Sequence, residues 1–406
     1  METGGIIMKK TKQILATLML TLGVTACGAE TTLQGTAQNM TVPETTLSQA
    51  QPLTNTQTGT IVAAQTDSGS FTERDLAQEA DLTGAVYETV TDGGALSVTK
   101  DGVYVLSGSA KDYTVTVEAG DEDKVQIVLD GVTITNTDFP AIYVKNADKV
   151  FLTTTDSENS LSVTGTFRAD GDTNTDAVIF SRDDVILNGT GTLTVNSTGN
   201  GISSKDEIKM TGGTLAIECT GDGLEANESI QMADGSLSIR SYKDGMHAEY
   251  DEDNSTGFIV ISGGVLEIAA ADDSIHATTY VQIDGGTMAL AGAECIEGTY
   301  IQINDGSINM AASDDGINAA NKSSSYYPTV EINGGSLTIQ MGQGDTDAVD
   351  SNGDLMINGG TLDIWAQSPF DYDGNASYNG GTVIVNGQEV SSLQNQQMGG
   401  GRGGRW

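Results

Sequence analysis

The chain has 406 residues, 37% of them hydrophobic and 5% aromatic, with 51 glycines and a formal net charge of −38 at pH 7. Such a length can bury a sizeable core, and abundant glycine with few aromatic residues is typical of short strands joined by many tight turns. The negative charge argues against nucleic acid and anionic lipid as direct partners, since both are bound through basic surfaces, and it favours cations.

The chain begins with a segment typical of exported lipoproteins. A lysine-rich start is followed by an apolar run from Ile14 to Val24, and this run ends just before Cys27. The run is too short for a membrane-spanning helix, which argues against an ordinary anchor helix. Small residues before the cysteine are typical of a cleavage site. We therefore predict a lipoprotein signal peptide over residues 1–26, lipidation at Cys27, and an extracytoplasmic protein anchored by lipid at the bacterial cell surface.

Composition divides the rest of the chain into three parts. Residues 27–84 are rich in Thr, Gln and Ser with little periodicity, so they are predicted to form a solvated tether. Residues 85–387 carry a repeat and are predicted to be the folded domain. Residues 388–406 are low in complexity and rich in glycine, which predicts a disordered tail.

The repeat in the folded domain is built on Gly-Gly or Asp-Gly turns, as in GGTLAI, DGSLSI and GGVLEI. The turn glycines recur at intervals near 22 residues, and each interval contains three short runs of alternating apolar residues. Alternation predicts half-buried strands, and a period of this length predicts stacked coils. We therefore predict an all-β fold, namely a right-handed parallel β-helix: a solenoid with about 22 residues and three short strands per coil. A leucine-rich repeat has a similar period, but its Leu/Asn consensus is absent.

Two of the intervals are longer, because each contains about seven extra residues at the same point of the coil. One insertion contains Tyr250 to Asn254, and the other runs from Lys322 to Pro328. Their coils are three apart, so the two loops are expected to project from one face about 14 Å from each other and to frame a shallow groove. Tyr250, Tyr326 and Tyr327 on these loops are candidate contacts for sugar rings.

Acidic residues recur once per coil near the ninth position after the turn glycine, and a second polar set follows three residues later. Stacked coils would convert these intervals into two neighbouring columns on one surface. The first column consists of Asp222, Asp244, Asp273, Glu294, Asp315 and Asp347. The second column consists of Glu225, His247, His276, Glu297, Asn318 and Asp350.

Carboxylates stacked in this way repel one another. Unit charges about 4.8 Å apart repel by roughly 1 kcal/mol in bulk water and by several times more in a surface groove. Bound cations would remove this repulsion, and carboxylate oxygens on irregular turns suit calcium. Only two histidines are present, which argues against zinc. We predict calcium ligands in both columns; the alternative is that the acids cap backbone amides in their turns and face water.

A second set of candidates is aromatic and basic. Phe258, Tyr280 and Tyr300 fall at the same position of three consecutive coils, where they either stack on one another or expose their rings to sugar. We include Tyr280 and Tyr300 among the predicted carbohydrate contacts. Lys243, which directly precedes Asp244, is included as well. The sequence contains no Ser-His-Asp or Cys-His arrangement, no phosphate-binding glycine loop and no dinucleotide fingerprint.

Whole phrases of the sequence carry a family resemblance, namely DGVYVLSG, DEDKVQIVLDGVTITN, PAIYVKNADKVFL, DAVIFSRDDVILNGTGTLTV and the following GGTL and DDGI segments. Over about residues 84–387 the chain resembles the bacterial surface proteins called carbohydrate-binding domain-containing proteins. The resemblance implies a right-handed parallel β-helix related in shape to polysaccharide lyases, bound calcium, and binding of plant cell-wall glycans such as cellulose and polygalacturonate. Ser274 and Cys295 replace the Gly of the usual Asp-Gly, so the predicted ligands rest on the register of the repeat.

We predict a surface lipoprotein that binds polysaccharide without cleaving it. Calcium would bridge the acidic columns and the carboxylates of an anionic glycan, while neutral glycans would contact the tyrosines. One alternative is a calcium-dependent polysaccharide lyase with Lys243 as its base. Another is a structural adhesin whose columns serve stability alone. Apart from polysaccharide, the predicted contacts are the membrane through the lipid anchor only and no nucleic acid, and the protein is expected to be a monomer.

Overall fold

The computed structural model describes residues 71–343 and 346–395. These residues belong to the second of two compact units, Asn55–Trp406. They form 36 strands and no helix, so no membrane-spanning helix occurs among them. The predicted signal peptide, Cys27 and most of the predicted tether lie outside the described residues.

The strands form a 12-stranded and a 24-stranded sheet. The 12-stranded sheet contains β2 (Ala95–Val98), β4 (Thr114–Glu118), β6 (Ile142–Asn146), β9 (Ala177–Ser181), β12 (Asn200–Ser204), β15 (Leu224–Ala226), β18 (Met246–Ala248), β21 (Ile275–Ala277), β24 (Ile296–Gly298), β27 (Ile317–Ala319), β30 (Val349–Ser351) and β33 (Asp371–Tyr372). The 24-stranded sheet contains β1 (Val86–Thr89), β3 (Gly102–Lys111), β5 (Lys124–Asn136), β7 (Lys149–Thr154), β8 (Glu158–Val163), β10 (Asp184–Gly189), β11 (Thr192–Ser197), β13 (Glu207–Met210), β14 (Thr214–Cys219), β16 (Ser229–Met232), β17 (Ser236–Arg240), β19 (Phe258–Ile261), β20 (Val265–Ala269), β22 (Tyr280–Ile283), β23 (Thr287–Gly292), β25 (Tyr300–Ile303), β26 (Ser307–Ala312), β28 (Thr329–Ile332), β29 (Ser336–Met341), β31 (Asp354–Ile357), β32 (Thr361–Trp365), β34 (Ala376–Tyr378), β35 (Thr382–Val385) and β36 (Gln388–Glu389).

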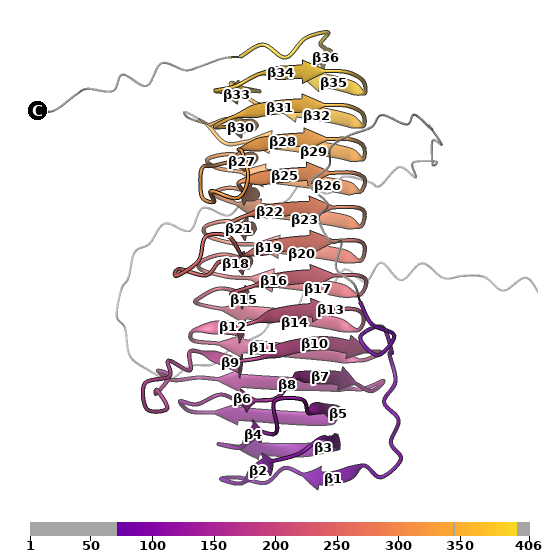
Figure 1. Cartoon of the computed structure of the whole chain (residues 1–406), viewed down its shortest axis with the longest axis vertical. Helices are drawn as coiled ribbons and strands as arrows, with labels where there is room; N and C mark the ends of the chain where they lie inside the picture. The colour runs from indigo at the N-terminus through magenta and orange to yellow at the C-terminus, as the bar shows by residue number, and fades with distance from the viewer. Residues whose placement is uncertain (1–70, 344–345, 396–406) are drawn as a thin grey trace, which may run out of the picture. The chain divides into compact units, whose positions relative to one another are not determined.

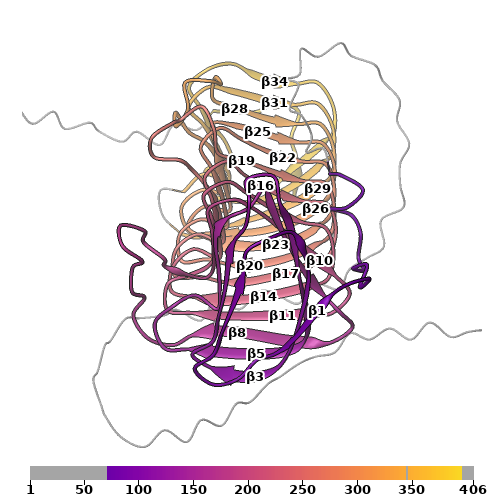
Figure 2. The same cartoon turned by 60° about the horizontal axis from the view of Figure 1, so that its bottom comes forward.

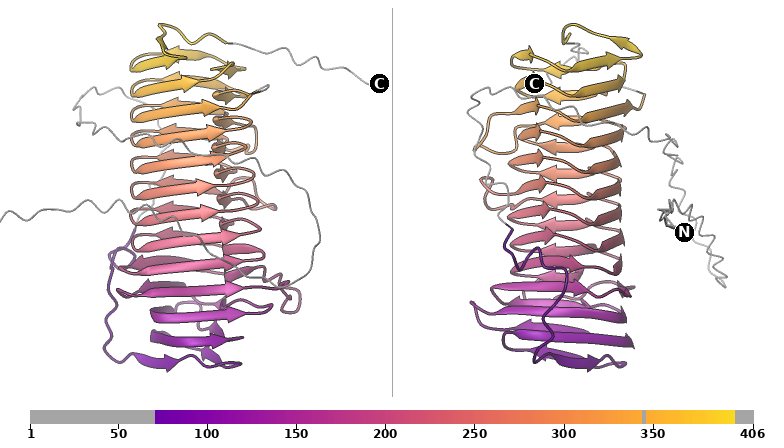
Figure 3. Two further views of the ribbon diagram at one scale, coloured as in Figure 1. Left: turned by 180° about the vertical axis from the view of Figure 1, so that it is seen from behind. Right: turned by 90° about the vertical axis from the view of Figure 1, so that its right-hand side faces the viewer.

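The strands pair in parallel with the matching strand of the next repeat. Ile202 of β12 pairs with Leu224 of β15, and Ile208 of β13 pairs with Ile230 of β16, each partner lying 22 residues later in the sequence. Among the described strands only β35 and β36 pair in antiparallel fashion. Figures 1 and 3 show the strands stacked along one axis, and Figure 2 shows the same stack with its bottom turned toward the viewer. The all-β parallel architecture is thus consistent with a solenoid or β-helix, as predicted.

The core lies inside the stack and is made by the alternating residues of each strand. Ile208, Met210, Leu215 and Ile217 are all buried, as the alternation predicts. The matching positions of the following repeats are again Ile, Leu or Met, so apolar side chains form continuous rows along the axis. Burying these rows contributes roughly 25 cal/mol for each Å² of apolar surface removed from water.

The turn glycines adopt a conformation that other residues rarely reach. Gly213, Gly235 and Gly264 have φ angles of 73°, 108° and 91°. A side chain at Gly264 would also place a Cβ only 2.5 Å from the Cε of Met232 in the preceding repeat. The recurrence of glycine therefore reflects both a left-handed backbone and close stacking of the turns.

The first described segment, residues 71–84, packs against the repeats, which corrects the predicted end of the solvated tether (Figure 1). Asp75 is fully buried, and its Oδ1 lies 3.6 Å from Lys149 Nζ. Gln78 donates from Nε2 to the backbone oxygen of Thr211 and accepts from the backbone N–H of Gly189, both at 3.0 Å. This docking was not predicted because the segment is hydrophilic and attaches through hydrogen bonds and ion pairs, which leave no apolar pattern in the sequence.

Replacing Asp75 with alanine is expected to lower the free energy of unfolding by about 1–3 kcal/mol, because Lys149 and neighbouring backbone groups lose a buried partner. Urea unfolding compared with Glu73→Ala, which alters an exposed acid of the same segment, measures the difference. Equal stability of the two variants would show that the docking contributes nothing.

At the other end, the described part of the predicted tail is also ordered. Val385 pairs with Gln388 of β36, and Leu393 packs into the core. The Tyr372 hydroxyl donates to the backbone oxygen of Leu393 at 3.2 Å. The end of the folded domain therefore extends beyond the predicted residue 387, to at least residue 395.

Candidate functional site

The two polar columns predicted from the repeat are formed. Along the 12-stranded sheet, Glu225 pairs with His247, which pairs with His276. The column continues through the register pairs His276 with Glu297, Glu297 with Asn318, and Asn318 with Asp350. Parallel in-register pairing brings these side chains to one outer face, because residues that pair across a parallel sheet point the same way.

In the first column, four of the six acids, namely Asp222, Asp244, Asp273 and Asp315, accept a hydrogen bond from the backbone of the next repeat. Asp222 Oδ1 accepts from the N–H of Asp244 at 3.0 Å, and Asp244 Oδ1 accepts from that of Asp273 at 2.9 Å. Asp315 Oδ1 accepts from the N–H of Asp347 at 3.0 Å. The backbone-capping interpretation is therefore correct for one carboxylate oxygen of these residues. The second oxygen of Asp222 faces Lys243, and that of Asp244 faces His247.

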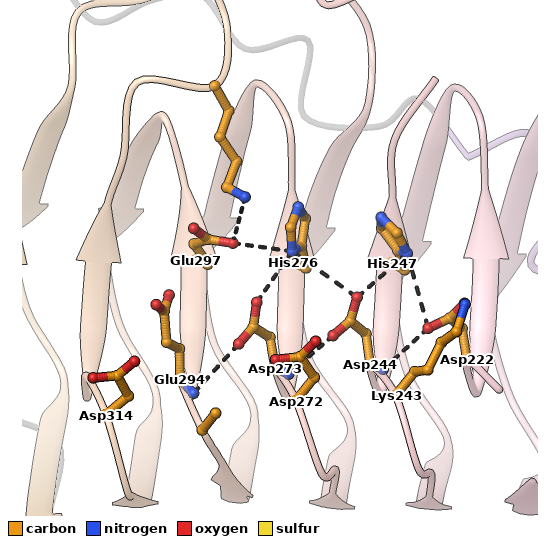
Figure 4. Close-up of a pocket in the computed structure, with 12 residues that line it drawn as sticks. Asp222, Lys243, Asp244, His247, Asp272, Asp273, His276, Glu294, Glu297 and Asp314 are labelled. Carbon is orange, nitrogen blue, oxygen red and sulfur yellow. Dashed lines mark hydrogen bonds and ion pairs between the residues drawn. The ribbon is translucent and has the colours of Figure 1, made fainter. Parts of the chain in front are cut away.

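The second oxygens open onto an acidic cleft with a volume of about 510 Å³ (Figure 4). We call this surface the acidic cleft and define it by its lining. Its lining consists of Asp222, Lys243, Asp244, His247, Asp272, Asp273, His276, Ala293, Glu294, Glu297, Asp314 and Lys322. Asp272, Asp314 and Lys322 are missing from the predicted site, although the doublets at 272–273 and 314–315 pointed to the first two.

Five predicted ligands do not line the acidic cleft, although they belong to the same columns. Glu225 accepts from Asn200 Nδ2 at 2.8 Å and lies 3.6 Å from Lys205 Nζ. Asn318 donates to both carboxylate oxygens of Glu294 at 3.1 Å. The remaining three lie further along the stack: Asp315, Asp347 and Asp350.

The two histidines stand in the middle of the cleft with their rings 4.7 Å apart. His276 Nδ1 lies 3.1 Å from Asp273 Oδ2 and 3.0 Å from Glu297 Oε2. Burial by itself would lower the pKa of His276, but these carboxylates outweigh it and raise the pKa to about 9. The ring is therefore an imidazolium at neutral pH, placed between two carboxylates that it neutralises.

His247 has the same role one repeat earlier. Its Nε2 lies 3.0 Å from Glu249 Oε2, and its Nδ1 lies 3.3 Å from Asp244 Oδ2. Burial opposes protonation, yet the carboxylates of Asp222, Glu249 and Asp244 raise the pKa of His247 to about 10. A protonated imidazole has no free lone pair, so in this state neither histidine is available as a metal ligand.

Two lysines add positive charge at the rim. Lys322, which comes from an inserted loop, lies 2.8 Å from Glu297 Oε2. Burial opposes the ionised form of Glu297, but His276 and Lys322 outweigh it and lower the pKa of this carboxyl to about 2. Lys243 Nζ lies 3.5 Å from Asp222 Oδ2, and its side chain is 64% exposed.

Positive charge does not balance the acids of the cleft. Seven carboxylates face two lysines and two histidines, so an excess of three negative charges remains when both imidazoles are protonated. Glu294 shows the effect, because burial and the charges of Glu297 and Asp273 raise its pKa to about 8. The cleft therefore favours an additional cation, either a proton or a metal ion.

Three groups of potential metal ligands converge in the cleft, each with its ligand atoms within 4.8 Å of one another. Two groups contain histidine: Asp244, His247 and His276, and also Asp273, His276 and Glu297. The third group is Asp244, Asp272 and Asp273 and consists of carboxylates alone. This third set contains no imidazole that protonation would remove as a ligand, although the Oδ2 atoms of Asp244 and Asp273 also face His247 and His276. Its oxygen donors fit a hard cation.

The aromatic candidates differ from their prediction. Phe258 and Tyr280 stack face to face at 4.8 Å, and the ring of Tyr326 covers Tyr280 at 5.6 Å and Tyr300 at 6.1 Å. Tyr280 is buried, and the Tyr300 hydroxyl donates to Glu331, so neither ring is an open sugar platform. The aromatic ladder packs on itself because the inserted loop folds over it.

The two inserted loops touch instead of framing a groove. Ser323 Oγ donates to the backbone oxygen of Asn254 at 2.5 Å. Tyr250 is half-buried and donates to Glu252, whereas Tyr327 is 60% exposed. Among the described residues the most exposed aromatic ring is one that was not predicted, Tyr242, which is 76% exposed and directly precedes Lys243 of the cleft lining.

Comparison with known proteins places the chain in a family. A family model described as carbohydrate-binding domain-containing protein matches residues 92–295 and 291–395. A curated protein of Acetivibrio thermocellus with the same description is 38% identical over 121 residues, which is 29% of this chain and 42% of that protein.

A solved structure, described as the polysaccharide lyase-like protein from C. thermocellum in a gadolinium derivative, aligns with a TM-score of 0.47 and 24% identity. The alignment covers 71% of this chain and 98% of that one. The family assignment rests on the matched family model, which spans more than half of the sequence. The chain belongs to the carbohydrate-binding domain-containing protein family.

Proposed function

We propose that this chain is a cell-surface lipoprotein that binds polysaccharide, without cleaving it, through a calcium-loaded face of a right-handed parallel β-helix. The observation that carries the proposal is the uncompensated negative charge of the acidic cleft beside the all-carboxylate group of Asp244, Asp272 and Asp273. The lipid anchor at Cys27 and the location at the bacterial surface rest on the sequence alone.

Asp244, Asp272 and Asp273 would hold the calcium ion, with Asp244 and Asp273 sharing their Oδ2 atoms between the ion and the neighbouring imidazoles. Calcium accepts six to eight oxygen ligands, so coordination positions remain open for a partner. The ion supplies a positive charge that links these carboxylates to the carboxylates of an acidic glycan such as polygalacturonate. His247 and His276 serve as fixed counter-charges that keep the flanking acids in place.

The surroundings of the basic groups support binding over cleavage. A lyase needs a neutral base near the substrate, and a lysine can serve only if its pKa is lowered. Burial alone would lower the pKa of Lys322, but its hydrogen bond to Glu297 outweighs burial and raises the pKa. The imidazoles of His247 and His276 are likewise held in their protonated forms.

Affinity electrophoresis in gels that contain polygalacturonate tests this function. We expect retardation of the protein with calcium and free migration with a chelator. Asp272→Asn is expected to lose most of the retardation, whereas Asp305→Asn, which removes one charge from an exposed turn elsewhere, keeps it. Identical mobility with calcium and with chelator would contradict calcium bridging. A calcium-induced rise in melting temperature without glycan binding would favour the structural adhesin.

Tyr242 is expected to support the glycan beside the cleft, because an exposed aromatic face packs against the apolar face of a sugar ring. Tyr242→Ala should weaken retention in polygalacturonate roughly tenfold, the loss of about 1.4 kcal/mol of binding free energy, without changing the melting temperature. Tyr87→Ala, which removes a 67% exposed ring far along the stack, is the matched control. Equal retention of both variants would exclude Tyr242 from the site.

A further inference from the structure

A second pocket opens on the outer face of the 12-stranded sheet, three strands before the acidic cleft. We call it the polar pocket; its volume is about 420 Å³. Its lining consists of Glu118, Tyr143, Lys145, Asn146, Asp170, Asp172, Thr173 and Arg182. None of these residues belongs to the predicted columns.

The floor of the pocket is rigid because aromatic side chains support it. Tyr143 of β6 pairs with Phe180 of β9, and their rings lie 5.9 Å apart. Phe139 packs edge-on against Tyr143 at 5.5 Å. Tyr143 and Phe180 are both almost completely buried, so they hold the strands together, and most of the pocket surface is polar.

The wall is a loop that is tied to this floor by hydrogen bonds. Asp170 and Thr173 exchange two backbone hydrogen bonds of 3.0 Å, which close the loop on itself. Asp170 Oδ2 accepts from the Tyr143 hydroxyl at 3.1 Å and lies 2.8 Å from Lys145 Nζ. Arg182 donates to the Thr173 hydroxyl. The pocket is therefore largely organised before any ligand arrives.

The chemistry of the lining differs from that of the acidic cleft and disfavours an anion. The three metal-ligand groups that the described residues bring together all lie in the acidic cleft. Three carboxylates and only two cations line the polar pocket, so a negatively charged group would be repelled. Ammonium, guanidinium and amide donors instead alternate with carboxylate acceptors, and sugar hydroxyl groups, which donate and accept at once, match such a lining.

We propose that the polar pocket is a second, metal-independent subsite that binds the hydroxyl groups of an uncharged sugar unit. The proposal rests on the polysaccharide binding proposed above and adds a ligand class that the acidic cleft does not serve. Phe180 pairs in register with Ser203, Ser203 with Glu225, and Glu225 with His247. The two sites therefore lie on the same face of the 12-stranded sheet. Three strand steps of about 4.8 Å separate them, a distance that one glycan chain spans. Engaging both sites would raise the affinity for such a chain.

Affinity electrophoresis with a chelator present in every gel tests the polar pocket. The probes are three neutral polysaccharides, namely mixed-linkage β-glucan, arabinoxylan and galactomannan. We expect at least one of them to retard the wild-type protein, and we expect Arg182→Ala to weaken this retention roughly tenfold. Arg240→Ala, which removes a cation from the exposed surface of β17, is the matched control and should behave like the wild type.

A second variant keeps the test decisive if Arg182→Ala does not fold. Asp172→Ala removes an exposed acceptor of the loop and is expected to weaken the same retention while the melting temperature stays unchanged. If no neutral glycan retards the wild type, or if both variants bind as the wild type does, the subsite is refuted. If the protein is still retained by polygalacturonate in the presence of calcium, the proposed function holds without the subsite. If that retention is absent as well, both the subsite and the proposed function are refuted.

Discussion

Replacing His276 with alanine is expected to lower the free energy of unfolding by about 3 kcal/mol near pH 8. The variant removes the imidazolium that lies within hydrogen-bonding distance of both Asp273 and Glu297. Both acids are buried. Without the imidazolium their charges would be left without a partner in a place that water reaches poorly, which destabilises the folded state. Urea unfolding measures the change.

Two comparisons separate charge from packing. Calcium added in excess should restore much of the stability of the His276→Ala protein, because a second cation then faces the same carboxylates. Lys100→Ala, which removes an exposed cation, should change the stability by less than about 0.5 kcal/mol. Full wild-type stability of the metal-free His276→Ala protein would show that the imidazolium is not the counter-charge that we describe.

The metal-free protein is expected to become less stable as the pH rises from about 6 to about 9. The raised pKa of His276, about 9 in the folded state against an ordinary 6.5, means that its stabilisation is complete below the unfolded value and is lost as the pH passes the folded value. Glu294 acts in the same direction. Burial and neighbouring acids raise its pKa to about 8, so the folded state binds more protons than the unfolded state between its ordinary value and about 8.

Thermal unfolding across this pH range, with calcium and with a chelator, measures the effect. Calcium should stabilise the protein strongly at high pH and weakly at low pH, because protons and calcium compete for the same carboxylates. A chelated protein whose melting temperature rises between about pH 6 and about pH 9 would contradict the protonation states assigned to His276 and Glu294.

The repeat made the architecture and the columns predictable. A residue of one repeat pairs with the residue about 22 positions later, so the spacing of Asp222, Asp244 and His247 in the sequence already encoded their lateral contacts. Such prediction succeeds because a solenoid turns sequence distance into spatial distance by one fixed rule. The docked segment around Asp75 does not follow this rule, since the Asp75 backbone oxygen accepts from Asn188 and Thr211, which lie 113 and 136 residues away.

The contents of the site were harder to predict than its position. Lys322 reaches Glu297 because an inserted loop folds back, and the same loop places Tyr326 over Tyr280. Loop conformation depends on contacts outside the repeat, which periodicity cannot reveal. The histidines were predicted as metal ligands because their spacing is right. Their protonation depends on how many carboxylates surround each ring, which only the folded structure specifies.

The counter-charges also explain why the acidic columns need not bind metal at every repeat. Around His247 and His276 the chain supplies its own cations, and one oxygen of each neighbouring Asp is used by the backbone. The unbalanced charge is left toward Asp272 and Asp314, the two exposed acids of the lining. Asp272 extends the group of Asp244 and Asp273 to this exposed edge, where a bound cation can contact a polysaccharide.

X-ray diffraction from crystals grown with calcium and an oligogalacturonate tests the central claim most directly. Anomalous scattering should reveal an ion about 2.3–2.6 Å from oxygens of Asp244, Asp272 and Asp273, with a carboxylate of the sugar completing its coordination. An acidic cleft that contains no ion while the oligosaccharide is bound, or an ion and sugar found together on another face, would contradict it.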